Sequence, residues 1–281
     1  MTAFRSNQHS LTTPRRIVVG LCVVASAFVG ACHSASTPTP APAPDRRREP
    51  APPIAITSGP TLLRAIHDRY ASTWYHTLTF TQRTTVSLAS GGEMVQTWYE
   101  AGEVPGKLRI DTDLPSKGGV LYAHDSTYNF ANGKLVKADS GMNELLVLGF
   151  DIYSQPVARS ETILRHLGFD LSKMHEATWQ GEPVYVVGAE RGDTLSRQFW
   201  ITRDNLLFVR ELARTRGGRA EYRFNKYVKS NGGWVASEVE QIVNGKRRVL
   251  EEYSNIRTNV PLSQGLLDPT QWATAPHWFK P

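Results

Sequence analysis

The residue types best suited to catalysis in this 281-residue sequence are its eight histidines and 26 acidic residues. His124, Asp125 and Ser126 are the three residue types of a hydrolytic triad, but consecutive positions on a turn cannot bring a nucleophile, a base and an orienting acid together. The sequence also has no G-x-S-x-G elbow, H-E-x-x-H motif or phosphate-binding loop. We therefore predict no catalytic residues and a protein that is not an enzyme.

The same residue types could instead bind a metal ion. His175 is followed by Glu176, and Glu238 and Glu240 flank Val239 in a segment of two-residue alternation. This alternation places both glutamates on the solvent face of a strand. The two cysteines of the sequence do not suffice for a thiolate site. We predict no metal and no cofactor.

Cys32 is the residue at which we expect a covalent modification. Three arginines and no acidic residue precede an apolar run over residues 17–31. That run has about the length of a signal-peptide core and is shorter than the roughly 20 residues that a membrane-spanning helix needs. It ends in Val29-Gly30-Ala31-Cys32, which resembles a bacterial lipobox. The resemblance implies that residues 1–31 are a cleaved lipoprotein signal peptide and that Cys32 is acylated. An ordinary secretory signal with a chance cysteine is the alternative.

Residues 32–60 are predicted to form a flexible tether between the lipidated cysteine and a folded domain. The stretch STPTPAPAP favours extended polyproline II because its prolines lack the N–H of helices and sheets. Three arginines follow at 46–48, with an acidic residue on either side. They are either a solvated charge run or a contact to anionic lipid headgroups.

Charge and cysteine content limit the function classes. The net charge is +6, and removal of residues 1–31 takes away three arginines and no acidic residue, which leaves +3. This near balance gives no reason to expect a nucleic-acid partner. Cys22 lies in the removed segment, so the mature chain has no second cysteine for a disulfide.

Hydropathy patterns predict one mainly β domain of the α+β class over residues 61–272, followed by a C-terminal tail over 273–281. Apolar residues at helical spacing predict a helix over 58–72, and the absence of alternation predicts two or three short helices over 141–174. The remaining segments alternate with period two, and Gly, Asn and Asp mark their turns. About ten or eleven antiparallel strands are expected, and a sheet of that size must curl. We predict a single curled sheet, a half-open barrel whose concave face is covered by the helices.

Two stretches resemble the LolA/LolB-type superfamily of outer-membrane lipoprotein-sorting proteins, which also includes the N-terminal domain of the sigma-factor regulator RseB. Residues 80–111 carry the Phe-x-Gln strand at 80–82 and the Pro-Gly-Lys-Leu-Arg strand at 105–109. Residues 199–272 resemble the closing meander, with Gly-Gly-Trp-Val at 232–235. The resemblance implies a half-barrel that encloses an apolar cavity for acyl chains.

Twelve side chains from the expected strands are candidates to line this cavity, although each could instead pack against the helices. They are Phe80, Leu108, Ile110, Tyr128, Phe130, Val184, Val186, Phe199, Ile201, Tyr222, Phe224 and Trp234.

The resemblance and the lipobox together predict a membrane-anchored periplasmic lipoprotein that binds acyl chains of lipoproteins or other lipids. We expect a monomer of the bacterial envelope, anchored through lipidated Cys32 to the outer membrane and facing the periplasm, of the sorting or acceptor type. Two alternatives remain. One is an RseB-like envelope sensor that acts through a protein partner, and the other is a structural lipoprotein without a ligand.

Overall fold

The computed structural model describes residues 55–215 and 217–280. The predicted signal peptide, Cys32 and most of the predicted tether lie outside the described residues. Among the helices that are described, none has the length and apolar character needed to cross a membrane.

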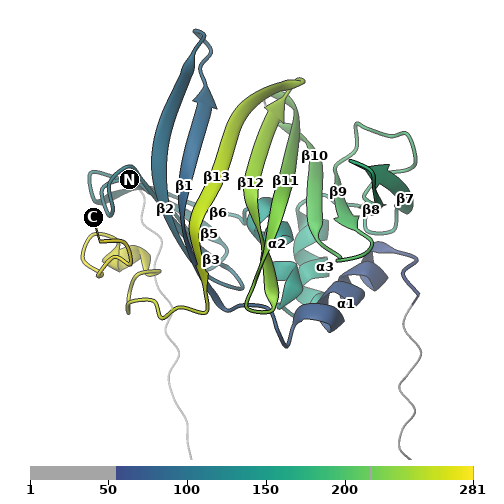
Figure 1. Cartoon of the computed structure of the whole chain (residues 1–281), viewed down its shortest axis with the longest axis horizontal. Helices are drawn as coiled ribbons and strands as arrows, with labels where there is room; N and C mark the ends of the chain where they lie inside the picture. The colour runs from purple at the N-terminus through teal and green to yellow at the C-terminus, as the bar shows by residue number, and fades with distance from the viewer. Residues whose placement is uncertain (1–54, 216, 281) are drawn as a thin grey trace, which may run out of the picture. The chain divides into compact units, whose positions relative to one another are not determined.

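One antiparallel sheet of 13 strands forms the framework, in the order β6-β5-β4-β3-β2-β1-β13-β12-β11-β10-β9-β8-β7 (Figure 1). The strands are β1 (Thr77–Ser87), β2 (Glu93–Glu103), β3 (Lys107–Thr112), β4 (Gly119–Ala123), β5 (Ser126–Ala131), β6 (Lys134–Ser140), β7 (Met174–Trp179), β8 (Glu182–Val187), β9 (Gln198–Thr202), β10 (Phe208–Thr215), β11 (Gly218–Ser230), β12 (Gly233–Val243) and β13 (Lys246–Thr258). The predicted curled, half-open sheet is confirmed. Its strand count is 13 rather than ten or eleven, because every short segment between two predicted turns forms a strand of its own.

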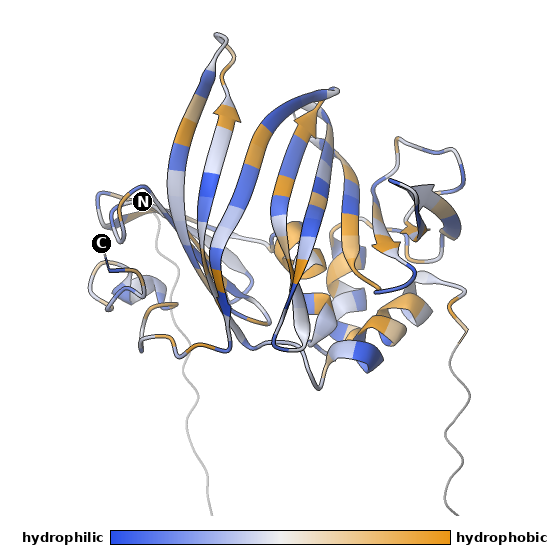
Figure 2. Ribbon diagram, in the orientation of Figure 1, coloured by the Kyte–Doolittle hydropathy of each residue, from blue (hydrophilic) through white to orange (hydrophobic). Residues whose placement is uncertain are grey.

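The first and last strands pair at the centre of the sheet. Strand β1 pairs with β2 on one side and with β13 on the other, so Thr84 lies opposite both Gln96 and Glu251. All other neighbours in the sheet are consecutive in sequence. Figure 2 shows apolar and polar bands alternating along β1, β2, β12 and β11, the pattern from which the strands were predicted.

Three α-helices pack on one face of the sheet (Figure 1). They are α1 (Gly59–Tyr70), α2 (Glu144–Gly149) and α3 (Val157–His166), and a short 3-10 helix, η1 (Asp151–Tyr153), follows α2. The side chain of Ser58 caps α1, and the stripe of Leu62, Leu63, Ile66 and Tyr70 is buried. These helices fill much of the concave face with apolar side chains.

The C-terminal segment covers the outer face of the opposite half of the sheet. Trp272, just after a second 3-10 helix, η2 (Pro269–Gln271), stacks on Phe130 of β5 with 4.1 Å between ring centroids. Contacts continue beyond residue 272, where the sequence predicted a tail. His277 Nε2 lies 3.0 Å from an Asp111 carboxylate oxygen, and Phe279 stacks on Tyr99 at 4.1 Å.

Candidate functional site

Most of the 12 predicted cavity residues lie on the concave face. Five are buried in the main core against the helices: Phe80, Leu108, Phe199, Ile201 and Phe224. Ile110 and Trp234 are partly buried and pack on that core. Tyr222 borders an open cleft instead.

The structure does not bring the other four predicted residues to that face. Tyr128 and Phe130 belong to a separate cluster with Trp272, and Val184 and Val186 belong to a third cluster with Val209. Alternation shows which residues of a strand share a face but not which face is concave. At both places the outer face is also covered, so apolar residues occur on both sides of the strand.

A cleft of about 450 Å³ separates the start of α2 from the concave face of the sheet. This volume lies in the range of about 300–1,000 Å³ that is typical of small-molecule sites. Strands β4, β5, β11, β12 and β13 form one wall, and the segment from Met142 to Leu145 forms the other. The end of α2 approaches the sheet closely at Gly149, where a Cβ atom would lie 2.9 Å from the Phe224 ring.

The cleft has an apolar part and a polar part. Its apolar lining consists of Tyr122, Met142, Leu145, Val239 and Val249. Its polar lining consists of Thr127, Asn143, Glu144, Tyr222, Gln241 and Glu251. This arrangement suits a ligand that is itself part apolar and part polar.

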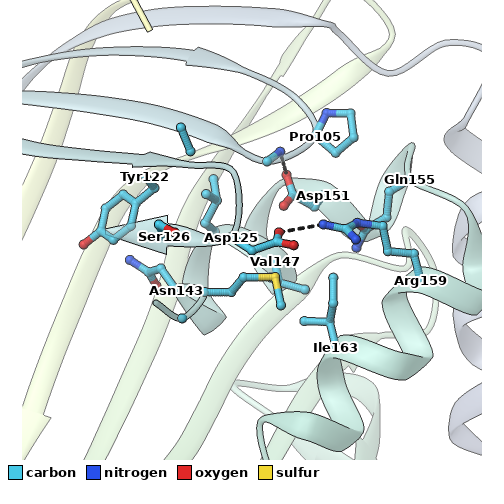
Figure 3. A pocket seen from close by; sticks show the side chains of 15 residues that line it. Pro105, Tyr122, Asp125, Ser126, Asn143, Val147, Asp151, Gln155, Arg159 and Ile163 are labelled. Carbon is cyan, nitrogen blue, oxygen red and sulfur yellow. Dashed lines mark hydrogen bonds and ion pairs between the residues drawn. The ribbon is translucent and has the colours of Figure 1, made fainter. Parts of the chain in front are cut away.

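A second, smaller cavity shares Tyr122, Met142 and Asn143 with the cleft. Figure 3 shows it between the β4–β5 turn and helix α3, with Asp125 paired to Arg159 at 2.6 Å. Its volume is about 60 Å³, which suffices for water but not for an acyl chain.

Asp151 lies at the wall of this smaller cavity and is 3% exposed. One of its carboxylate oxygens accepts a hydrogen bond from the Gly106 N–H at 2.9 Å (Figure 3). Burial raises the pKa of Asp151 to about 7, and this hydrogen bond and the positive charge of Arg159 only partly offset the effect of burial.

Three further carboxylates project from the concave face. Glu251 borders the cleft and accepts a hydrogen bond from the Tyr253 hydroxyl at 2.9 Å. Burial raises its pKa to about 7. Glu100 lies opposite Phe80 and Ile110 and is 3% exposed, and burial and the nearby Glu251 raise its pKa well above the usual range.

Glu211, the third of these carboxylates, has a basic partner. Arg197 lies 3.2 Å from one of its oxygens and also donates to Glu144 at 2.8 Å and to the Leu167 carbonyl oxygen. Burial and the neighbouring Glu144 raise the pKa of Glu211 to about 8 despite this pairing. One arginine is thus shared between two carboxylates.

The triad residue types on the β4–β5 turn are engaged elsewhere. The hydroxyl of Ser126 donates to the carbonyl oxygen of His124 at 3.2 Å, and Asp125 pairs with Arg159. Within residues 55–215 and 217–280, no cluster of three or more His, Cys, Asp or Glu side chains could hold a metal ion. The described cleft offers binding groups for a ligand rather than a nucleophile with its base.

Sequence reasoning missed the carboxylates and the α2 residues of the cleft. Glu100 shares a strand face with Trp98, and Glu251 shares one with Tyr253. The signal that could have identified these carboxylates is an acidic residue two positions away from an aromatic residue on the same face of a strand. Met142 and Leu145 could not be placed, because their position depends on how α2 packs against strands distant in sequence.

Comparisons with known proteins show likeness in structure but not in sequence. The sequence matches no family model and no curated protein. A domain described as an outer-membrane lipoprotein-sorting domain from Vibrio parahaemolyticus superposes with a TM-score of 0.55 at 13% identity, covering 76% of this chain and 98% of that one. A DUF1329 family protein from Desulfovibrio piger gives 0.51 at 15% identity and covers 76% and 97%.

A LolA superfamily protein from Nitrosomonas europaea covers 73% of this chain and 96% of its own, with a TM-score of 0.46 at 10% identity. The likeness to the proteins from Vibrio and Desulfovibrio extends over nearly their whole length. The chain therefore shares the fold of the Vibrio lipoprotein-sorting domain and the Desulfovibrio protein, as the resemblance in its sequence predicted.

Proposed function

We propose that this protein binds the acyl chains of a lipoprotein or another lipid in the cleft between α2 and the concave face, without catalysing a reaction. The observation that carries this proposal is the cleft itself. The helices fill one part of the half-barrel and leave about 450 Å³ unfilled over the rest of its inner face.

The apolar part of the cleft would hold the chain. Tyr122, Met142, Leu145, Val239 and Val249 provide this contact surface from both walls. Each methylene group that moves from water into such a site contributes about 0.8 kcal/mol. An unbranched chain requires no directional contact, so a wall built from several strands can bind it.

The fold and the leader segment support a place in the bacterial envelope. The similar Vibrio domain is described as an outer-membrane lipoprotein-sorting domain. The lipobox-like end of the leader supports an anchor at Cys32, and the prolines after it support a tether. In this proposal the protein is a monomer of the outer membrane, acts as an acceptor on the periplasmic side and has no nucleic-acid partner.

Mass spectrometry of organic extracts tests the binding proposal. The purified protein is expected to release a lipid, and an added lipid is expected to displace the neutral fluorescent probe N-phenylnaphthylamine from the cleft. Leu145→Trp should fill the cleft and abolish both signals. Leu135→Trp is the matched control, because Leu135 is 50% exposed on β6 and away from the cleft. An empty extract together with no probe displacement would refute the proposal.

Cell fractionation tests the anchor separately. Cys32→Ala should move the protein from the membrane to the soluble fraction, whereas Cys22→Ala should leave its distribution unchanged. Membrane association of Cys32→Ala would contradict an anchor at that residue.

A further inference from the structure

The polar part of the cleft is lined by two acidic side chains, Glu144 and Glu251, and by no basic side chain of the described residues. Glu251 borders the cleft and accepts a hydrogen bond from the Tyr253 hydroxyl at 2.9 Å, and the side chain of Gln82 also lowers its pKa by hydrogen bonding, although burial raises that pKa more strongly. Nearby, Gln82 is 1% exposed, and its amide donates to the Thr84 hydroxyl while its buried Oε1 atom has no partner. A ligand that supplies donors would satisfy these atoms.

Glu100 is an independent sign of the same deficit. Its side chain is 97% buried, on the face of β2 that continues the wall containing Glu251. No hydrogen bond or ion pair within residues 55–215 and 217–280 involves its carboxylate. A buried carboxylate without a partner is costly in its charged form, which agrees with its raised pKa.

Tyr253 connects these two carboxylates. Its hydroxyl donates to Glu251, and its ring stacks on Phe80 at 4.3 Å. Phe80 lies directly opposite Glu100 in the pairing of β1 and β2. The acceptors therefore occupy one continuous part of the inner face.

No basic side chain of the described residues borders the cleft. The nearby Arg197 is already bound to Glu144, Glu211 and the carbonyl oxygen of Leu167. A positive charge at Glu100 and Glu251 would therefore have to come from the ligand.

We propose that the cleft selects amphiphiles whose polar end carries a primary ammonium group, held by Glu251 and Glu100. This inference rests on the proposed function and names the head group of the ligand. An ammonium group has three N–H donors and a compact positive charge, which suit two carboxylates and an amide oxygen. The alkyl chain would then extend along Leu145, Val239 and Val249.

The proposal makes anionic head groups poor ligands. A carboxylate or phosphate in the same place would meet Glu251 and Glu144 of the lining, with Glu100 close to Glu251 and no cation among the lining residues. The ionised fraction of these carboxyl groups repels an anion, and partial burial weakens screening of this repulsion by salt. A neutral head group should bind with intermediate affinity.

Three ligands with one common chain test this selectivity. Oleylamine, oleyl alcohol and oleic acid are titrated at pH 7 below their aggregation thresholds, and each Kd is obtained from displacement of N-phenylnaphthylamine. We expect oleylamine to bind about tenfold more tightly than the alcohol, equivalent to about 1.4 kcal/mol. Oleic acid should bind most weakly.

Matched variants assign the effect to the inner carboxylates. Glu251→Gln should bring the Kd of the amine to that of the alcohol and leave the alcohol unchanged, and Glu100→Gln should act in the same direction. Glu252→Gln is the control, because Glu252 is adjacent in β13 on the other face, where it pairs with Arg83 at 2.9 Å. An amine preference that persists in both inner variants would overturn the assignment.

The outcomes separate this inference from the proposed function. Equal binding of all three ligands, or tightest binding of the acid, refutes ammonium selectivity and leaves acyl-chain binding intact. Failure of every ligand to displace the probe refutes both. A preserved affinity for the alcohol shows that a variant is folded and that its cleft is intact.

Discussion

Buried acidic residues have different surroundings on the two faces of the sheet. On the outer face, Arg109 and Asp111 are both fully buried and form a bidentate pair, with Nε–Oδ2 at 2.7 Å and Nη2–Oδ1 at 2.9 Å. Asp111 also accepts from the Ser116 N–H at 2.6 Å, and the Arg109 guanidinium lies 3.9 Å from the centre of the Trp272 ring. On the inner face, Glu100 is as deeply buried but has none of these partners among the described residues.

His277 completes the outer network from the far end of the described chain. Its Nδ1 atom accepts from the Phe279 N–H at 3.0 Å, so Nε2 carries the proton and donates to Asp111. Burial alone would raise the pKa of Asp111. Hydrogen bonds from Arg109 and His277, together with the charge of Arg109, lower this pKa instead. The pKa of Glu100 is raised instead.

This difference separates a buried pair that holds the fold together from a buried carboxyl group for which we propose a ligand. A buried charge with all its partners fixes the C-terminal segment on the sheet. A buried carboxyl group without such partners among the described residues is costly in its charged form, and in our proposal an ammonium ligand offsets this cost.

Breaking the Arg109–Asp111 pair should have the largest effect. Arg109→Ala leaves Asp111 buried without its counter-charge, and we expect a loss of about 3–5 kcal/mol in the free energy of unfolding, measured with urea. Arg83→Ala is the control, since Arg83 forms an exposed pair with Glu252 and its loss should cost less than about 1 kcal/mol. Equal losses in the two variants would show that the buried pair stabilises the protein no more than the exposed pair does.

The inner side of the molecule should lose stability as pH rises. Asp151 releases its proton near pH 4 when unfolded and near pH 7 when folded, so the folded state binds more protons between these values. The contribution of Asp151 to the free energy of unfolding is fully present below pH 4 and is lost as the pH rises to 7. At about 1.4 kcal/mol per pKa unit, this loss amounts to at most roughly 4 kcal/mol.

Asp151→Asn should therefore flatten the decline of the unfolding free energy between pH 4 and pH 8. The amide oxygen can still accept from the Gly106 N–H, so the two proteins should be similar at pH 4 and the variant more stable at pH 8. Asp139→Asn, at an exposed site on β6, should leave the profile unchanged. A profile of Asp151→Asn that parallels the wild type would contradict the raised pKa.

Loss of the C-terminal contact should have a smaller effect. His277→Ala removes the hydrogen bonds to Asp111 and from Phe279 but leaves the Arg109–Asp111 pair, and a decrease of about 1–2 kcal/mol in the free energy of unfolding is expected. His166→Ala, at an exposed position on α3, should be neutral. A neutral His277→Ala would mean that residues 273–280 contribute little to stability.

Local patterns in the sequence were enough to predict the fold. Alternation in β1 placed Leu78, Phe80, Gln82 and Thr84 on one face, and the pairing with β2 and β13 confirms it. Asn and Gly at the turns marked the strand ends, as at Asn132. These signals act over a few residues, so one sequence suffices to read them.

The site depends on contacts between distant residues. Phe130 is in the outer cluster because Trp272, far along the chain, covers that face of β5. Among residues 55–215 and 217–280, the ionisable neighbour that acts on Glu100 is Glu251, a second acid that is distant in sequence. No local pattern in the sequence reports either relation.

The most direct test of the contrast between the faces replaces one acid on each face by its amide. Urea unfolding at pH 7 is measured for Asp111→Asn and Glu100→Gln, two changes that preserve the shape of the side chain and replace a carboxyl group by an amide. We predict that Asp111→Asn lowers the free energy of unfolding by about 2–3 kcal/mol, because Arg109 loses its buried counter-charge. Glu100→Gln should leave the unfolding free energy within about 1 kcal/mol or increase it, because the carboxyl group has no counter-charge to lose among the described residues. A loss from Glu100→Gln as large as that from Asp111→Asn would contradict the account.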